Sequence, residues 1–378
     1  MDRHGGNTFG RKIEYDFSVN LSPLGLPERV KTDLKNLIDD KELENYPDYR
    51  QRNLRSSIAK VFGVNPEMVS CGNGAADLIY RIPIAIKQEL MAVGEGEEGP
   101  KALILAPTFS EYSKALKEGG FNRFYHVVEE RYGFLPGEDF LNKVQNGGYQ
   151  IVWICNPGNP TGALMSKEYI ERLVNICETN NSYLVLDECF MELTEEGDKN
   201  SLINEINNHP GLIVIRSFTK TYAMAGLRLG YVICGDPGLA EVIREIGQPW
   251  DISKPAEVAG ISALEDEEYI GNVRAFLREE GSKLYKSLID MGLKAVKPSG
   301  NYIMFSGPKT LDEILINKGV LIRNCSNYIG LEEENYSYEG SKEGHKAGWN
   351  WYRVAVKLPE ENRILLEALK EAMDLNRG

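Results

Sequence analysis

The sequence predicts an α/β protein: a large domain with a mixed, mostly parallel seven-stranded sheet between helices, followed by a smaller α+β domain. Short apolar runs alternate with helical stretches along the first two thirds of the chain, which is typical of a doubly wound sheet. Several runs are almost continuous in Val, Ile and Leu, as expected for parallel strands covered by helices on both faces. The predicted strands are 68–72, 102–107, 123–128, 151–157, 183–188, 212–218 and 229–235.

We expect the large domain to span residues 46–255 and the small domain residues 256–378. A long helical stretch over 257–290 begins the small domain, three strand-like runs follow with little helix among them, and a helix closes the chain. The N-terminal segment, residues 1–45, has too few strand signals for a core of its own, so it should pack with the small domain and across to the large one. The three runs are 301–307, 319–325 and 351–359.

Two polar stretches interrupt this pattern. Residues 94–101 are acidic and rich in Gly, which is typical of a solvated loop. Residues 331–351 are polar but contain several aromatic side chains. The second stretch could be a disordered insertion or a flap over a pocket, and its aromatic residues favour the flap.

Composition argues against several classes of function. The chain has 378 residues and a formal net charge of -13, and its sequence pI is about 5.1. Such an acidic balance argues against general binding to nucleic acid or to anionic membranes, although a local arginine cluster can still bind a small anion. The polar N-terminus and the lack of a long apolar run predict a cytoplasmic protein with no membrane span.

Cysteine and histidine usage predicts neither disulfides nor a metal site. None of the 6 Cys forms a C-x-x-C pair, and most lie in apolar runs, where a free thiol behaves as a small hydrophobe. The 4 His are scattered, with no pair at the helical spacing of metal ligands. We therefore expect reduced cysteines and no bound metal.

The stretch "SFTKTYAMAGLRLG", residues 217–230, is the first candidate for chemistry. Lys220 follows a predicted buried strand, hydroxyl side chains flank it, and Arg228 comes shortly after. A single lysine is usually a solvated surface charge. Hydroxyls and an arginine together are phosphate ligands, however, and a lysine amine can form a Schiff base with an aldehyde, so the stretch predicts a phosphorylated aldehyde as ligand. The hydroxyls belong to Ser217, Thr219 and Thr221.

Three other strand ends carry residues suited to such a ligand, and in a doubly wound sheet ligands bind at the carboxyl ends of strands. "CGNGAAD" places Gly74, Ala75 and Ala76 at the start of a predicted helix, where backbone N–H groups attract an anion. "NPGNPTG" offers asparagine amides on a backbone that prolines make rigid. Asp187 ends the apolar run "YLVL", and a buried carboxylate is costly unless it is paired. An ordinary turn would explain the glycine motif, and no single motif is specific by itself, but the order of the motifs along the chain is.

In this order the motifs resemble the fold-type I, pyridoxal 5'-phosphate (PLP) dependent enzymes of the class I/II aminotransferase family. The likeness covers nearly the whole chain and includes "NPGNPTG", "LVLDE", "SFTKTYAMAGLRLGY" and "YRVAV". It implies PLP as the cofactor. Lys220 would form the Schiff base with the PLP aldehyde, and Asp187 would pair with the protonated pyridine nitrogen, so that the ring remains an electron sink.

The resemblance also implies the remaining contacts with the cofactor. Asn159 would form a hydrogen bond with the 3'-oxygen of the ring, and Phe109 would stack on the ring. Tyr46 would reach the cofactor phosphate of a neighbouring subunit, which implies a homodimer with shared active sites. Within its own subunit the phosphate would be held by Gly74, Ala75, Ala76, Ser217, Arg228 and, as a second hydroxyl candidate, Thr219.

Two sub-families resemble the chain and differ in their reaction. One is histidinol-phosphate aminotransferase, which moves an amino group; the other is the L-threonine-phosphate decarboxylase of the cobalamin pathway, which removes a carboxylate. "HGGN" with His4, and "DFSVNLSPLGLP" with Asn20, resemble the decarboxylase and would put both residues near the substrate. Phe190 stands where most aminotransferases have a Tyr that would bond the ring oxygen, although a Phe can simply pack. We favour the decarboxylase and keep the aminotransferase as the alternative.

Two arginines are expected to bind the substrate. Arg353, in "YRVAV", matches the family's arginine that clamps the substrate α-carboxylate by a two-pronged hydrogen bond. Arg323, in "LIRNCSNY", would face a substrate phosphate in both sub-families. Together they predict a small anionic amino acid or amine as substrate. Asp251 and Lys254, in "PWDISKPA", receive no role.

A PLP-binding regulator without catalytic activity is a more distant alternative, because fold alone does not decide function. Such regulators usually carry an additional DNA-binding domain. The acidic chain has no segment left over for one. We therefore expect an enzyme.

Overall fold

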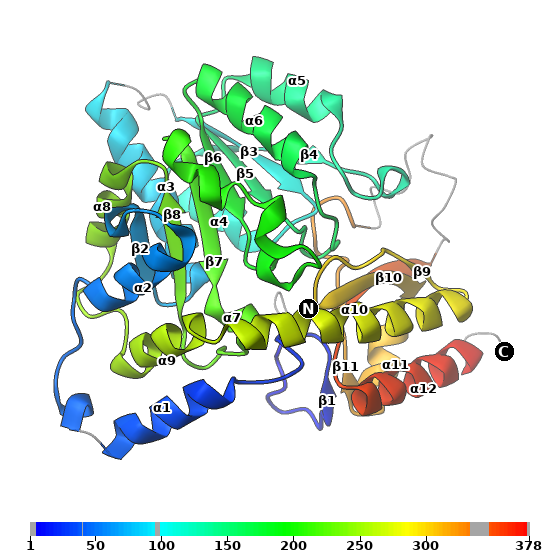
Figure 1. Ribbon diagram of the computed structural model, residues 1–378. Helices are drawn as coiled ribbons and strands as arrows, with labels where there is room; N and C mark the ends of the chain where they lie inside the picture. The colour runs from blue at the N-terminus through cyan, green and yellow to red at the C-terminus, as the bar shows by residue number, and fades with distance from the viewer. Residues whose placement is uncertain (1–4, 40, 95–98, 333–347, 376–378) are drawn as a thin grey trace.

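The computed structural model describes residues 5–39, 41–94, 99–332 and 348–375 (Figure 1). Its larger part is built on a seven-stranded sheet of order β2-β8-β7-β6-β5-β3-β4. β8 runs antiparallel to both of its neighbours, and the other neighbouring strands are parallel, so the predicted mixed sheet is confirmed. The strands are β2 (Val69–Gly72), β3 (Lys101–Ala106), β4 (Asn122–Val127), β5 (Ile151–Cys155), β6 (Tyr183–Asp187), β7 (Leu212–Ser217) and β8 (Gly230–Cys234).

Helices cover both faces of this sheet. α3 packs against α4 and α8, α5 packs against α6, and the two groups lie on opposite faces (Figure 1). β5 and β7 are buried along their whole length, as expected for apolar runs between two helical layers. The helices are α2 (Arg52–Phe62), α3 (Ala75–Ala92), α4 (Ser110–Glu118), α5 (Glu138–Gly147), α6 (Lys167–Thr179), α7 (Phe218–Thr221) and α8 (Pro237–Ile246), with 3-10 turns η1 (Lys41–Glu44), η2 (Pro66–Met68), η3 (Glu130–Tyr132), η4 (Met191–Leu193), η5 (Gly197–Asn200) and η6 (Ile203–Asn208).

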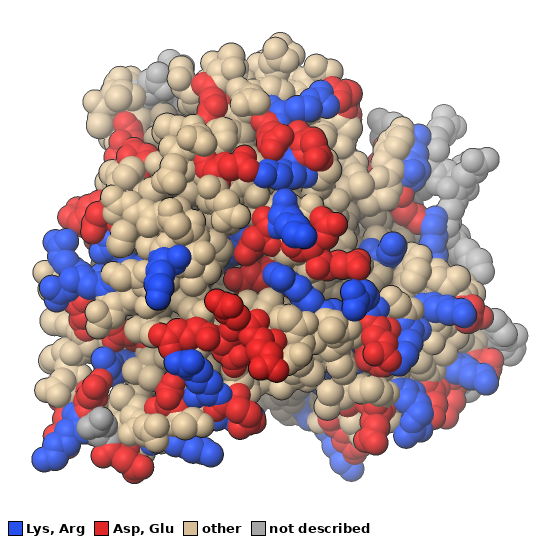
Figure 2. All heavy atoms as spheres, viewed as in Figure 1, with Lys and Arg blue, Asp and Glu red and all other residues tan. Residues whose placement is uncertain are grey.

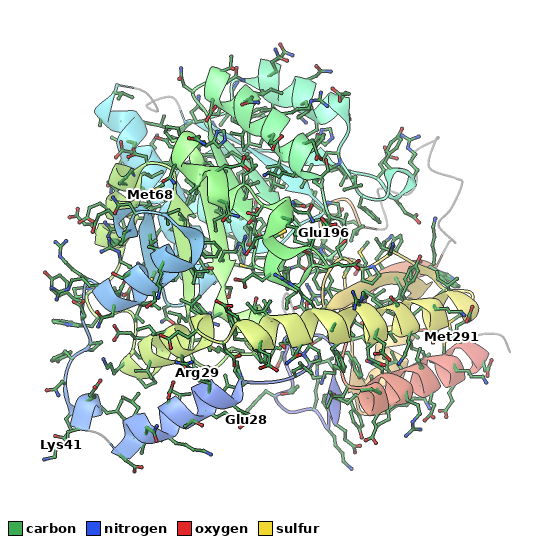
Figure 3. The ribbon with its side chains drawn as sticks, viewed as in Figure 1. Glu28, Arg29, Lys41, Met68, Glu196 and Met291 are labelled. Atoms are coloured by element: carbon green, nitrogen blue, oxygen red, sulfur yellow. The ribbon has the colours of Figure 1, made fainter. Side chains whose placement is uncertain are left out.

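The N-terminal segment contacts both parts of the molecule. β1 pairs in parallel with β11 of the smaller part, whereas α1 packs against α9, which also packs against α2 of the larger part. Arg29 of α1 forms an ion pair with Glu265, just after α9 (Figure 3). The domain boundaries at residues 45 and 255 stay a prediction. These elements are β1 (Tyr15–Asp16), α1 (Glu28–Asp39), α9 (Lys254–Leu264) and β11 (Val320–Leu321).

The single helical stretch expected over 257–290 is replaced by two helices, α9 and α10 (Glu267–Asp290). The Asp266 side chain accepts a hydrogen bond from the backbone N–H of Tyr269 at 3.1 Å and so caps the start of α10. Acidic residues fill the first turn of α10, which favours a new helix start at this point over a continuous helix.

The smaller part is a four-stranded antiparallel sheet of order β12-β13-β10-β9. The sequence predicted little helix among these strands, and α11 corrects that expectation. α11 forms because acidic residues occupy its first turn and Leu311 and Leu315 give it a buried face. The elements are β9 (Lys294–Ala295), β10 (Tyr302–Pro308), β12 (Arg323–Asn324), β13 (Trp349–Ala355), α11 (Leu311–Asn317) and α12 (Pro359–Leu375).

Lysine and arginine side chains are interspersed with aspartate and glutamate on the face shown in Figure 2. Within the described ranges, no helix has the length and apolar character needed to cross a membrane. Those same residues contain no group of three or more His, Cys, Asp or Glu side chains placed to hold a metal ion. Much of the two polar stretches, residues 95–98 and 333–347, lies outside the described residues, so the solvated loop and the flap stay predictions.

Candidate active site

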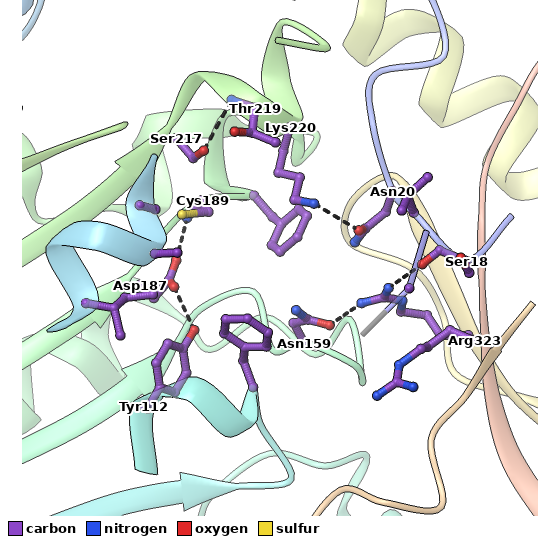
Figure 4. Close-up of a pocket in the computed structure, with 18 of the residues that line it drawn as sticks. Ser18, Asn20, Tyr112, Asn159, Asp187, Cys189, Ser217, Thr219, Lys220 and Arg323 are labelled. Atoms are coloured by element: carbon purple, nitrogen blue, oxygen red, sulfur yellow. Dashed lines mark hydrogen bonds between the residues drawn. The ribbon is translucent and has the colours of Figure 1, made fainter. Parts of the chain in front are cut away.

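A cavity of about 250 Å³ lies at the carboxyl ends of β5, β6 and β7 and reaches the small sheet (Figure 4). Parallel neighbouring strands bring their carboxyl ends to one edge of a sheet, so motifs that are far apart in the sequence meet here. Of the predicted site residues, those that line the cavity are Asn20, Ala75, Ala76, Phe109, Asn159, Asp187, Ser217, Thr219, Lys220, Arg228, Arg323 and Arg353.

Lys220 lies in α7, directly after β7, and its side chain extends toward Asn20 (Figure 4). Lys220 Nζ donates a hydrogen bond to Asn20 Oδ1 at 3.5 Å. Burial lowers the pKa of Lys220 to about 8, and the charges of Arg353 and Arg228 act in the same direction. The neutral amine, which is the nucleophilic form, is therefore accessible near neutral pH.

Asp187 ends β6, and each of its carboxylate oxygens has a partner (Figure 4). Oδ2 accepts a hydrogen bond from the Tyr112 hydroxyl at 2.6 Å, and Oδ1 accepts one from the backbone N–H of Cys189 at 3.0 Å. Burial raises the pKa of Tyr112 well above its usual value, so the phenol keeps its proton and acts as the donor. The two bonds hold the carboxylate in the cavity wall, where it can bind a cationic group of a ligand.

The start of α3 and Arg228 form a cup suited to an anion. Gly74 is the N-cap of α3 with a φ of 81°, and no side chain caps this helix, so an anion can bond its first N–H groups. A Cβ added at Gly74 would lie 2.5 Å from Arg228 Nη2, which shows how closely the guanidinium approaches the turn. At the end of β7, Ser217 Oγ accepts a hydrogen bond from the backbone N–H of Thr219 at 3.2 Å. A phosphate in the cup would meet a helix N-terminus, a guanidinium and two hydroxyls.

Arg353 and Arg323 come from the adjacent strands β13 and β12, and each is 5% exposed. Arg353 donates hydrogen bonds to Asn159 Oδ1 and to the backbone oxygen of Ser18 at 2.8 Å. Arg323 Nη2 donates to Asn327 Oδ1 at 3.0 Å. Together with Arg228, these two guanidinium groups make the cavity positive despite the acidic chain, which suits a ligand with more than one negative charge.

Aromatic rings line the apolar side of the cavity. The ring of Phe109 stands edge-on to that of Tyr112, with centroids 5.7 Å apart. Phe190 packs edge-on against Tyr302 with centroids 5.0 Å apart, and its ring centroid lies 6.0 Å from Lys220 Nζ. Phe190 therefore presents a hydrocarbon surface, and not a hydroxyl, to the lysine amine.

Two of the predicted site residues that the structure describes do not line the cavity. Gly74 lies behind its wall, as the N-cap of α3. Tyr46 is 80% exposed and packs on Trp250 with ring centroids 4.6 Å apart and the rings tilted by 31°, so it lies on the surface of its own chain. Its role in a neighbouring subunit stays a prediction. His4 lies outside the described residues.

Sequence reasoning missed several residues of the site. Tyr112 follows Phe109 by three positions, which puts both on one side of the start of α4, and this spacing is a signal that could have found it. Ser18, Cys189 and Tyr328 also line the cavity. Their residue types and spacing carry no comparable signal, because they reach the cavity through the fold of three separate segments.

Comparison with known proteins identifies the family. The family model for aminotransferase class I and II matches residues 12–369. The chain is 30% identical over 363 residues to threonine-phosphate decarboxylase of Salmonella typhimurium, covering 95% of this chain and 91% of that protein. It is 26% identical over 362 residues to histidinol-phosphate aminotransferase of Methanosphaera stadtmanae, covering 94% of this chain and 89% of that protein.

A solved structure gives the same relationship at the level of the fold. The histidinol-phosphate aminotransferase from Clostridium acetobutylicum superposes with a TM-score of 0.81 at 28% identity, covering 95% of this chain and 99% of the other. Both the family model and this structure extend over the larger and the smaller part of the molecule. The chain therefore belongs to the class I and II aminotransferase family of enzymes.

Proposed function

We propose that the cavity binds PLP and that the enzyme acts on a small phosphorylated amino acid, with decarboxylation of L-threonine O-3-phosphate as its reaction. The residues present fit PLP. The cup at α3 offers donors for a phosphate, Asp187 offers a carboxylate for a protonated ring nitrogen, and Lys220 offers an amine for an aldehyde. Among the described residues, the buried Asn20 Nδ2 and Arg353 Nε have no hydrogen-bond partner, which leaves donors in the cavity for a bound molecule.

Each residue has a separate task in holding PLP. Lys220 would bond its aldehyde carbon, Asp187 would keep the ring nitrogen protonated, and Tyr112 would keep Asp187 in place. Phe109 would contact the face of the ring, and Asn159 its 3'-oxygen. The phosphate would be held by Gly74, Ala75, Ala76, Ser217, Thr219 and Arg228.

PLP supplies an electron sink for the electron pair that remains on the substrate when a bond to its Cα breaks. In a decarboxylation the carbon–carbon bond breaks, carbon dioxide leaves, and Cα takes up a proton. Lys220 suits this proton transfer because its pKa of about 8 lets it carry or release a proton near neutral pH. Phe190 beside it has no proton to exchange, so its ring takes no part in this transfer.

The observation that carries the substrate class is the presence of Arg323 and Arg353 in one cavity. An α-carboxylate and a phosphate need two separate cations, and the planar guanidinium fork suits both groups. The relative that is 30% identical is named threonine-phosphate decarboxylase, which supports the same substrate. The expected products are carbon dioxide and an amino-alcohol phosphate.

Histidinol-phosphate aminotransferase is the alternative. The relative at 26% identity and the solved structure at 28% identity carry that name. Transamination requires a proton to be moved from Cα, which Lys220 could also perform. Histidinol phosphate has a phosphate but no carboxylate, however, so both arginines would have to serve that one phosphate.

The deciding experiment compares the two substrates on the same holoenzyme. L-Threonine O-3-phosphate should release carbon dioxide and amino-alcohol phosphate in equal amounts, whereas histidinol phosphate with 2-oxoglutarate should yield no glutamate. Glutamate from histidinol phosphate, without carbon dioxide from threonine phosphate, would reverse the assignment.

Lys220→Ala should fold but retain no PLP after borohydride reduction. Lys254→Ala, whose lysine pairs with Glu42 and Glu257, should retain it.

We also propose that the protein works in the cytoplasm as a homodimer in which Tyr46 contacts the cofactor phosphate of the other subunit. Tyr46 and Trp250 expose aromatic rings that pack against each other on the surface of one chain, and aromatic rings are enriched where subunits meet. A two-fold dimer is the commonest assembly and would use this surface twice.

A further inference from the structure

Asp251 and Arg81, which lie outside the cavity wall, are connected to its anion cup by a chain of hydrogen bonds. Arg81 Nη2 donates to Asp251 Oδ2 at 2.6 Å, and Arg81 Nε donates to Asp77 Oδ1 at 2.9 Å. Arg81 Nη2 also pairs with Asp77 Oδ2. The side chains of Arg81 and Asp251 are each 7% exposed, so their pairing takes place away from solvent.

This series of hydrogen bonds ends at the backbone of the turn that forms part of the anion cup. Asp77 Oδ2 accepts a hydrogen bond from the backbone N–H of Asn73 at 2.9 Å, and the N–H of Gly74 is bonded to the oxygen of Gly72 at 2.7 Å. Residues 72–74 therefore form a tight turn that Asp77 ties to the first turn of α3. Because no side chain caps α3, this tie is what fixes the direction of its first N–H groups.

Arg81 also compensates a negative charge at the start of α3. Asp77 lies in the first turn of α3, at the helix end that attracts an anion, and its carboxylate alone would repel a phosphate bound there. Arg81 bonds both oxygens of that carboxylate and so compensates its charge. Arg81 is in turn held by Asp251, which belongs to the loop between α8 and α9.

On its other side, Asp251 is bonded to the loop that precedes α2. Gln51 Nε2 donates to Asp251 Oδ1 at 2.6 Å. Gln51 has a φ of 52°, a left-handed conformation that is costly for a residue other than glycine and persists where surrounding contacts hold it. Trp250, next to Asp251, packs on Tyr46, which lies in the loop that precedes α2. Asp251 thus joins the loop that carries Tyr46 to the turn at the start of α3.

We propose that Arg81 and Asp251 are positioning residues that hold the turn of residues 72–74, through Asp77, in the shape that receives the phosphate of the cofactor. The inference rests on the proposed function, since it presupposes that this turn receives the phosphate of PLP. The role of Asp251 is indirect, because Asp251 acts through Arg81 and Asp77 and does not itself contact the bound molecule.

The test measures binding to the protein freed of cofactor, with PLP and with pyridoxal, which has the same aldehyde and ring but no phosphate. Arg81→Lys keeps the charge but loses the fork that joins Asp77 to Asp251. Asp251→Ala removes the anchor of Arg81. Each change should weaken PLP binding about tenfold, the loss typical when a partner of a binding residue is removed, and change pyridoxal binding less than about twofold.

A purely electrostatic effect gives the opposite sign for Asp251→Ala, because removing a negative charge near the cup would tighten phosphate binding. A purely structural effect would weaken PLP and pyridoxal equally. Glu280→Ala is the matched control: it removes a carboxylate with a 9% exposed side chain, paired to Lys283 on α10, and should leave both affinities unchanged.

The outcomes separate this inference from the proposed function. If the unmodified protein binds neither PLP nor pyridoxal, the proposed function fails and the inference fails with it. If it binds PLP but both variants bind PLP as tightly as it does, or lose both ligands equally, only the inference is overturned. Should Asp251→Ala not fold, Arg81→Lys decides the question alone, because a lysine keeps the positive charge beside Asp77.

Discussion

Arg323 and Arg353 are directly opposed in the antiparallel ladder between β12 and β13, so both side chains leave the small sheet on the same face and enter one cavity. Like charges at directly opposed positions destabilise a sheet. A ligand that carries two negative groups would remove that repulsion by placing an anion on each guanidinium. The register of two short strands thus favours a doubly anionic substrate more strongly than either arginine does alone.

Arg353 and Arg323 should each bind a different anionic group of such a substrate. Arg353→Ala is expected to weaken every amino-acid substrate, because each has an α-carboxylate, whereas Arg323→Ala should weaken phosphorylated substrates selectively. A charge-assisted bond to an anion contributes about 1.5–3 kcal/mol, so each loss should lower kcat/KM by about tenfold to a hundredfold. The measurement is a double-mutant cycle with L-threonine phosphate and L-threonine.

An equal loss on both substrates from Arg323→Ala would remove the argument for a phosphorylated substrate, and with it the preference for the decarboxylase. If histidinol phosphate is the substrate instead, both arginines serve one phosphate. The two single variants would then damage the same contact, and their effects in the cycle would be strongly non-additive.

Tyr112→Phe should loosen the cofactor without unfolding the protein. The change removes the 2.6 Å bond to Asp187 and leaves a buried carboxylate with one donor fewer. Because a hydrogen bond to a charged group contributes about 1.5–3 kcal/mol, the dissociation constant of PLP should rise at least about tenfold. The matched control is Tyr80→Phe, which removes a 2.6 Å bond from a phenol to Glu111 outside the cavity wall. Equal effects of the two changes on PLP binding would contradict a special role for Tyr112.

The lowered pKa of Lys220 predicts how cofactor capture depends on pH. The neutral amine is the reactive form, so the rate at which the protein freed of cofactor captures PLP should rise with pH and level off above about 8. An ordinary lysine, with a pKa of about 10.4, would show the rise more than two units higher. Arg353→Ala should move the midpoint upward, because Arg353 is one of the charges that lower this pKa. A midpoint that stays in place in that variant would show that Arg353 does not contribute to the lowered pKa.

The same shift has a consequence for stability. Between pH 8 and 10.5 the unfolded chain binds a proton at Lys220 that the folded chain has already lost. The free energy of unfolding of the cofactor-free protein should therefore gain a contribution from this residue as the pH rises through that window. Denaturant unfolding of the protein and of Lys220→Ala at both ends of the window checks the sign, because the variant lacks this contribution.

Contiguous motifs made part of this site predictable. Lys220 and Asp187 each follow an apolar strand directly, so the parallel sheet determines which edge they reach. Tyr112 was missed because its role depends on the distance between α4 and β6, although its spacing from Phe109 carried a usable signal. The contact of Asp251 with Arg81 joins positions 170 residues apart, and no local pattern encodes such a pairing. The break between α9 and α10 is encoded locally, by the capping Asp266, so the sequence did carry a signal for it.

The exposed position of Tyr46 leads to a last prediction, which concerns subunits. If Tyr46 completes the site of the other subunit, each active site takes Lys220 from one subunit and Tyr46 from the other. Tyr46→Ala and Lys220→Ala then remove residues that different subunits contribute to one site. Each variant alone should be strongly impaired. After mixing, unfolding and refolding in equal amounts, half of the dimers should be mixed, and each mixed dimer has one site with both residues intact and one with neither. The mixture should therefore regain about one quarter of the unmodified activity.

A measurement of the mass of the assembly and a second control mixture complete that experiment. Light scattering should give twice the mass of one chain for the protein and for both variants, because each substitution changes a single side chain of the proposed dimer. A mixture of Lys220→Ala with Asp187→Ala is the control: both residues line the cavity of their own chain, although they act on one cofactor. Every site in that mixture lacks one of them, so no activity should return. Recovery of activity in the control but not with Tyr46→Ala would contradict a shared site, and so would a fully active monomer. Tyr46 would then be a surface residue that packs on Trp250.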